Sequence, residues 1–125
     1  MRSENSPRGD ASSASGAGEQ EQGQSAAARV WAQYRGMIFE RLAAVETAAT
    51  TMREASLTQE VRQEGVLEAH RLAGSLGMLG LQEGTRLARE IEHLLKEEPP
   101  ASPDAPHRVA ELAAALRVEL EKGPA

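Results

Sequence analysis

Cysteine is absent from the 125 residues of the chain, and the aromatic side chains amount to one Trp, one Tyr and one Phe. Without cysteine the protein has no disulfide framework, no thiolate metal site and no thiol nucleophile. The sequence has no run of about 18 apolar residues, and its N-terminus lacks the apolar centre of a signal peptide. We therefore expect a cytoplasmic protein that does not interact with membranes.

Basic residues are also in the minority. The formal net charge is −5 and the isoelectric point is near 5.2, so the chain lacks the basic surface typical of nucleic-acid binding and we expect no nucleic-acid partner. The length suits one domain. Leu and Ala outnumber Val, Ile and Thr, which favours helices over strands and an aliphatic core.

The composition changes near residue 25. Residues 1–25 contain no Leu, Ile, Val or aromatic side chain. Such a segment cannot bury enough apolar surface to offset the entropy lost on ordering, so a disordered tail is predicted over residues 1–25. The folded domain is predicted over residues 26–122.

From residue 25 onward, apolar residues recur every three or four positions, which is typical of amphipathic helices. Gly80 takes the position of a C-cap glycine, and the proline-rich residues 99–106 form a loop. The periodicity predicts four helices. The first starts at Ser25 and carries its apolar stripe to Met52, and the second runs from a capping box at Ser56 to about Leu79. The third starts at about Gln82 and buries residues up to Leu95, and the fourth starts at Ser102–Pro103 and is ended by Gly123 and Pro124. Because such helices bury their apolar faces against one another, we predict an all-α antiparallel four-helix bundle.

His70 lies on the second of these helices and is predicted to point to water. At about 100° per residue it falls roughly opposite the apolar face of its helix. That face is formed by Val61, Gly65, Leu72, Leu76 and Leu79.

The helix positions that flank His70 carry unusually small side chains. Ala73, Gly74 and Gly77 follow it by three, four and seven residues. A glycine inside a helix costs about 0.8–1 kcal/mol relative to alanine, so two of them on a solvent face suggest a surface cleared for another protein. Val66 and Leu67, one turn before the histidine, add an apolar docking rim. The alternative is a run of small residues with no role in an Ala-rich chain.

The stretch from Ala69 to Leu81, AHRLAGSLGMLGL, resembles the signature of histidine phosphotransfer (HPt) domains. That signature reads roughly His-x-x-Lys-Gly-Ser, with a further Gly ten residues after the His. His70, Gly74, Ser75 and Gly80 match at these offsets. The resemblance implies a four-helix bundle with the active histidine exposed on its second helix, which agrees with the periodicity.

The resemblance also implies a function. In such a domain the imidazole, here His70, accepts a phosphoryl group from a receiver-domain aspartate or from a sensor histidine kinase, and passes it to another receiver. The protein would thus be a phosphorelay carrier and not an enzyme, with receiver domains of response regulators and/or a sensor histidine kinase as partners. No cofactor of its own is implied, because the Mg²⁺ that offsets phosphoryl charge is held by the receiver. We expect it to be a monomer.

The resemblance assigns roles to two further positions. The family often has a phosphate-binding Lys where this chain has Ala73. Arg71 is basic but points about 100° away around the helix, and Lys96 is a second candidate for the same contact. Glu92, which follows the histidine by 22 residues, corresponds to a residue that bonds one imidazole nitrogen and leaves Nε2 unprotonated. Alternatively, Glu92 and Lys96 form only a solvated ion pair.

Two other classes of function remain open. The first is a helical adaptor that docks a receiver or kinase without being phosphorylated, and the second is a structural bundle that oligomerises through Val66 and Leu67. An adaptor has no need of His70, and an oligomer would fill the glycine strip with larger side chains. His93 and His107 have no paired ligands at metal spacing, so no metal site is expected.

Overall fold

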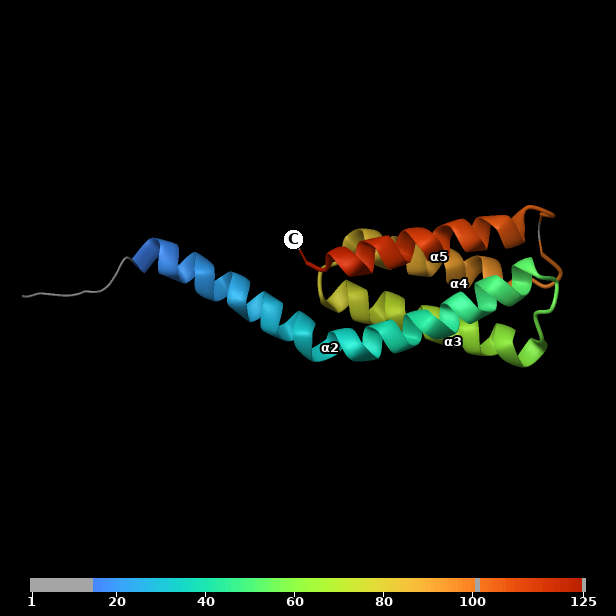
Figure 1. Cartoon of the computed structure of the whole chain (residues 1–125). Helices are drawn as coiled ribbons and strands as arrows, with labels where there is room; N and C mark the ends of the chain where they lie inside the picture. Colours follow the sequence, from blue (N-terminus) through green and yellow to red (C-terminus); the bar gives the residue numbers. More distant parts are fainter. Residues whose placement is uncertain (1–14, 101, 125) are drawn as a thin grey trace, which may run out of the picture. The chain divides into compact units, whose positions relative to one another are not determined.

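The computed structural model describes residues 15–100 and 102–124 of the chain. This part of the chain forms four helices and no strand: α2 (Ser15–Arg53), α3 (Gln59–Met78), α4 (Gln82–Lys96) and α5 (Ala105–Lys122). The chain divides into two compact units, residues 1–33 and 34–125. Within the second unit, successive helices reverse direction and lie side by side (Figure 1), so the predicted all-α antiparallel four-helix bundle is confirmed.

The first helix begins earlier than the sequence suggested. α2 begins at Ser15, before the expected start at Ser25. The physical reason is that a lack of apolar side chains argues against a core but not against a helix, and Ala, Glu and Gln are strong helix formers. Residues 1–14 of the expected tail lie outside the described residues.

The core of the second unit is aliphatic and takes buried side chains from all four helices. Each such side chain contributes about 1.5–3 kcal/mol when it is fully buried. On α2 the buried face begins at Ile38. Val30 and Tyr34, which come before it, are 41% and 43% exposed. The largest fully buried side chains are Ile38, Leu42, Val45, Leu72, Leu76, Ile91, Leu95, Val109, Leu116 and Leu120.

Two predicted helix starts were wrong by a few residues. α3 is capped by Thr58, whose Oγ1 accepts a hydrogen bond from the Val61 N–H at 3.1 Å. Ser56 cannot cap α3, because its N–H and its hydroxyl both donate to the Thr51 carbonyl and close the end of α2. α5 begins at Ala105, after a turn around the predicted start at Ser102–Pro103.

The turn between α3 and α4 determines how these two helices face each other. Gly80 has a φ of +76°, the left-handed conformation in which glycine carries no steric penalty. The N–H of Leu81 donates to the Leu76 carbonyl at 2.9 Å, and the N–H of Gly80 donates to the Gly77 carbonyl at 3.1 Å. This Schellman motif reverses the chain within three residues, so residues equally distant from the turn lie opposite each other.

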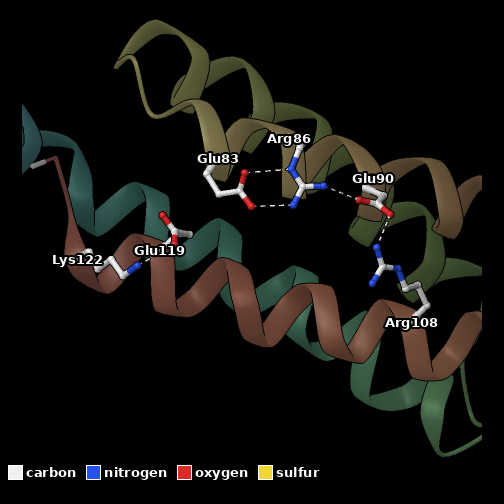
Figure 2. Close-up of polar contacts among 6 residues, drawn as sticks. All are labelled: Glu83, Arg86, Glu90, Arg108, Glu119 and Lys122. Carbon is white, nitrogen blue, oxygen red and sulfur yellow. Dashed lines mark hydrogen bonds and ion pairs between the residues drawn. The ribbon is translucent and has the colours of Figure 1, made fainter.

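Charged side chains link α4 to α5 along the surface (Figure 2). Arg86 donates to Glu83 at 2.7 Å and to Glu90 at 3.1 Å, and Glu90 also accepts from Arg108 of α5 at 2.9 Å. The hydrogen bonds from Arg86 hold the pKa of the Glu83 carboxyl below its usual value. Exposed pairs of this kind contribute little to stability, so they orient α5 more than they stabilise it.

α3 approaches α2 closely at Gly65, and we predict that alanine is not tolerated there. An added Cβ would lie 2.6 Å from the Ala48 Cβ and 3.2 Å from the Leu95 Cδ1. Gly65→Ala should therefore lower the free energy of unfolding by about 1–3 kcal/mol, as overpacking does. Urea denaturation followed by circular dichroism measures this change.

Gly74→Ala is the matched control on the same helix. A Cβ at Gly74 would meet nothing within 4 Å, so this variant should gain up to about 1 kcal/mol from helix propensity. Equal unfolding free energies for the two variants would contradict the close approach of α3 to α2.

Candidate functional site

His70 lies in the second half of α3 with its ring in solvent. Its side chain is 72% exposed, which confirms the predicted orientation. The Nδ1 atom lies 3.0 Å from Oε2 of Glu92, which projects from α4 and is only 13% exposed. Two residues that are 22 positions apart meet because the turn at Gly80 sets the register of the two helices.

The contact made by His70 differs from the contacts of the other two histidines. His93 and His107 each place Nε2 near a glutamate one turn ahead on the same helix, at 3.8 Å from Glu97 and 3.3 Å from Glu111. His70 instead uses Nδ1 and a largely buried carboxylate of a neighbouring helix. Among the residues that the structure describes, none bonds to its Nε2. A proton held on Nδ1 therefore leaves the Nε2 lone pair directed outward.

Glu92 is shared between the imidazole and a lysine. The Lys96 Nζ atom lies 3.2 Å from the same Oε2 atom that faces His70, and the lysine side chain is 60% exposed. The carboxylate thus lies between a ring that can become cationic and a permanent cation. Both cationic partners therefore reach the same oxygen of a carboxylate that is only 13% exposed.

The surface beside the ring is bare at Gly74 and Gly77. Both residues are exposed, a Cβ at Gly74 would meet nothing within 4 Å, and a Cβ at Gly77 would touch only the Thr85 hydroxyl at 3.9 Å. No packing requirement therefore explains either glycine. Ala73 was expected in the same strip, but it is 4% exposed. It is covered because it lies on the side of α3 along which α4 packs, whereas Gly74 lies on the other side of His70.

A shallow groove runs from His70 toward the start of α3. Val66 is half-buried in it and Leu67 is 42% exposed, so both present apolar surface next to the ring. The remainder of the groove is polar. Its lining comprises Gln59, Arg62, Gln63, Val66, Leu67, His70, Glu92, Lys96 and Glu98.

Arg71 is engaged elsewhere. Its guanidinium lies 3.2 Å from Oε2 of Glu68, a residue of the same helix.

Arg41 of α2 donates to the Ser75 hydroxyl at 2.9 Å. This contact connects the serine that matches the motif to the neighbouring helix. Arg41 was not expected from the sequence, where its only signal is a basic residue next to the buried position of Leu42.

The described residues hold neither a cluster of metal ligands nor a helix suited to a membrane. Within residues 15–100 and 102–124, no three His, Asp or Glu side chains are grouped so that they could hold a metal ion. In the same part of the chain, no helix combines the length and the hydrophobicity that crossing a membrane requires.

We predict that Glu92 determines which ring nitrogen of His70 carries the proton. Glu92→Ala removes the acceptor and should shift the neutral ring toward the Nε2–H form, which free imidazole side chains prefer. Glu92→Gln is the matched control, because its amide oxygen can still accept from the Nδ1–H. The ¹⁵N chemical shifts of the neutral ring report the tautomer. Identical shifts in the wild type and the alanine variant would show that Glu92 does not orient the ring.

A model of the Hpt domain family matches residues 29–121 of the chain. The matched segment includes His70, Glu92 and the exposed glycines, together with nearly all of the bundle. No curated protein and no solved structure matches the chain significantly, so the family model carries the assignment. The chain belongs to the Hpt domain family, whose members have a histidine phosphotransfer role in phosphorelays.

Proposed function

We propose that this chain is a phosphoryl carrier and that Nε2 of His70 is the acceptor atom. The observation that carries the proposal is the contact of the exposed ring, through Nδ1, with Glu92 of the adjacent helix. It distinguishes this ring from those of His93 and His107, whose Nε2 atoms face local glutamates. A nitrogen nucleophile must have its lone pair free and accessible. In His70 the Nδ1 contact with a carboxylate of the neighbouring helix fixes the ring so that Nε2 is the free and exposed nitrogen.

The proposed transfer conserves charge without a proton leaving the ring. The Nε2 lone pair forms a bond to phosphorus as the bond from phosphorus to the receiver aspartate oxygen breaks, and the aspartate departs as a carboxylate. The proton on Nδ1 stays in place, so the phosphorylated ring is cationic. The carboxylate of Glu92, 3.0 Å from Nδ1, stabilises this charge as it develops. The reverse step hands the phosphoryl group to a second receiver.

The partners in this proposal are receiver domains of response regulators and/or a sensor histidine kinase. Gly74 and Gly77 let a partner backbone approach the ring, and Val66 and Leu67 supply an apolar rim on the other side. The Mg²⁺ that offsets phosphoryl charge belongs to the receiver. The carrier itself would be a cytoplasmic monomer that needs no cofactor.

Lys96 and Arg71 are the basic residues on either side of the ring in this proposal. To reach a phosphoryl oxygen, Lys96 would give up its ion pair with Glu92. Arg71 would likewise give up its ion pair with Glu68. Each exchange replaces one charged partner by another, so the net electrostatic gain is small. The alternative function, an unphosphorylated adaptor, uses the same exposed surface but gives no role to the His70–Glu92 contact.

Substitution of the acceptor is the direct test. Each candidate receiver is phosphorylated with labelled acetyl phosphate and mixed with the full chain, and label that is acid-labile and base-stable is measured. His70→Gln should abolish this label and leave the fold intact, since the side chain is 72% exposed. His93→Gln and His107→Gln are matched controls and should take label at the wild-type rate. Undiminished label in His70→Gln would show that another residue is the acceptor. A wild-type chain that binds the receiver but takes no label would favour the adaptor function.

The exposed glycines provide a separate prediction about docking. Gly74→Leu or Gly77→Leu should slow transfer from a phosphorylated receiver about tenfold or more, because about 1.4 kcal/mol of lost docking energy suffices for that change. Labelling by phosphoramidate, a donor small enough to avoid the clash, should be much less affected. Ala115→Leu places the same leucine side chain at an exposed position of α5 and should change neither rate. Equal transfer from the receiver in all three variants would exclude the strip as the docking surface.

A further inference from the structure

Arg89 of α4 lies level with the position where the family often has its phosphate-binding lysine. Two pairs of residues give the register of α3 and α4. The His70 Nδ1 atom lies 3.0 Å from Oε2 of Glu92, and a Cβ added at Gly77 would lie 3.9 Å from the Thr85 hydroxyl. In each pair the two residues are equally distant from Leu81, which follows Gly80 in the turn. By the same register, Arg89 on α4 is opposite Ala73 on α3, the residue that stands in place of the lysine.

Arg89 differs from the other basic residues near the ring in its ion pairing. Lys96 is held by Glu92 and Arg71 is held by Glu68. Arg89 is exposed, and its guanidinium has no ion-pair partner among the described residues. It lines a shallow groove at the end of the glycine strip together with Gly77, Gly80, Gln82, Thr85 and Arg86.

We infer that Arg89 contacts the oxygens of the phosphoryl group on His70, from α4 instead of α3. The inference rests on the proposed function. Three helical positions separate the level of Arg89 from that of His70, a rise of about 4.5 Å that an extended arginine side chain spans. Ala73, between the two, is too short to obstruct this path.

The chemistry of the guanidinium fits this role better than the alternatives do. Its planar fork can donate to two phosphoryl oxygens at once, whereas an ammonium acts as a point charge. Arg89 breaks no ion pair when it binds, unlike Lys96 and Arg71. It neither gives nor takes a proton in the transfer, so its contribution is to offset the charge on the phosphoryl oxygens in the transition state.

The test uses the full chain and phosphoramidate as the phosphoryl donor, so that docking of a protein partner does not enter. The rate of phosphoryl uptake on His70 is followed by intact-mass spectrometry. Arg89→Gln should lower this rate about 10- to 100-fold, the range for one charge-assisted hydrogen bond made in the transition state. Arg89→Lys should recover part of the rate, because the charge returns without the fork.

Several controls separate phosphoryl binding from a structural role. Arg53→Gln removes another exposed arginine, in the groove between α2 and α5, and should keep the wild-type rate. The thermal midpoint and the ¹⁵N shifts of the His70 ring should be unchanged in Arg89→Gln. Lys96→Gln and Arg71→Gln should each slow uptake less than Arg89→Gln does.

The outcomes distinguish this inference from the proposal on which it rests. A wild-type rate in Arg89→Gln, or a larger loss in Lys96→Gln or Arg71→Gln, would overturn the role of Arg89 and leave His70 as the acceptor. Altered ring shifts in Arg89→Gln would instead assign it a structural role. Failure of the wild type to take label from phosphoramidate and from every phosphorylated receiver would overturn the proposed function itself, and this inference with it.

Discussion

The site depends on the turn that joins α3 to α4. Gly80 adopts a left-handed conformation, and the two hydrogen bonds of the Schellman motif reverse the chain within three residues. A one-residue slip of α4 against α3 would rotate Glu92 away from His70 by about 100°. The 3.0 Å contact between Nδ1 and Oε2 therefore reports the accuracy of this turn. A short turn is suited to this purpose because it has few conformations among which the register could vary.

The bundle is closely packed inside, whereas the exposed surface of α3 carries two glycines. Inside, Gly65 lets α3 approach Ala48. A Cβ added at Gly84 of α4 would lie 3.1 Å from the Leu76 Cδ1 atom. Outside, Gly74 and Gly77 lower helix propensity without any gain in packing. Glycine thus serves two opposite purposes on one helix. The aliphatic core supplies enough stability to tolerate the exposed pair, which is the usual relation between a binding surface and its scaffold.

Electrostatics around the ring are organised in pairs. Glu92 contacts both the imidazole and Lys96, and Glu68 contacts Arg71. Such pairing holds side chains in place at little energetic gain, because most of these groups reach solvent. In the proposed transfer, the incoming phosphoryl group would bring negative charge into this arrangement. The cation that responds most readily is one without a carboxylate of its own, and on this side of the bundle that description fits Arg89.

The sequence by itself determined the helices, their apolar faces and the exposure of His70, because periodicity gives the angle of each residue around its helix axis. It could not show which neighbouring helix covers the residues on either side of His70. Ala73 and Gly74 lie on either side of the histidine, yet only Ala73 is buried, since α4 packs along one side alone. The motif suggested that Glu92 and His70 interact, but their 3.0 Å separation is a tertiary fact that depends on the turn. The choice of Thr58 over Ser56 as a cap was likewise decided by the structure, because Ser56 already closes the preceding helix.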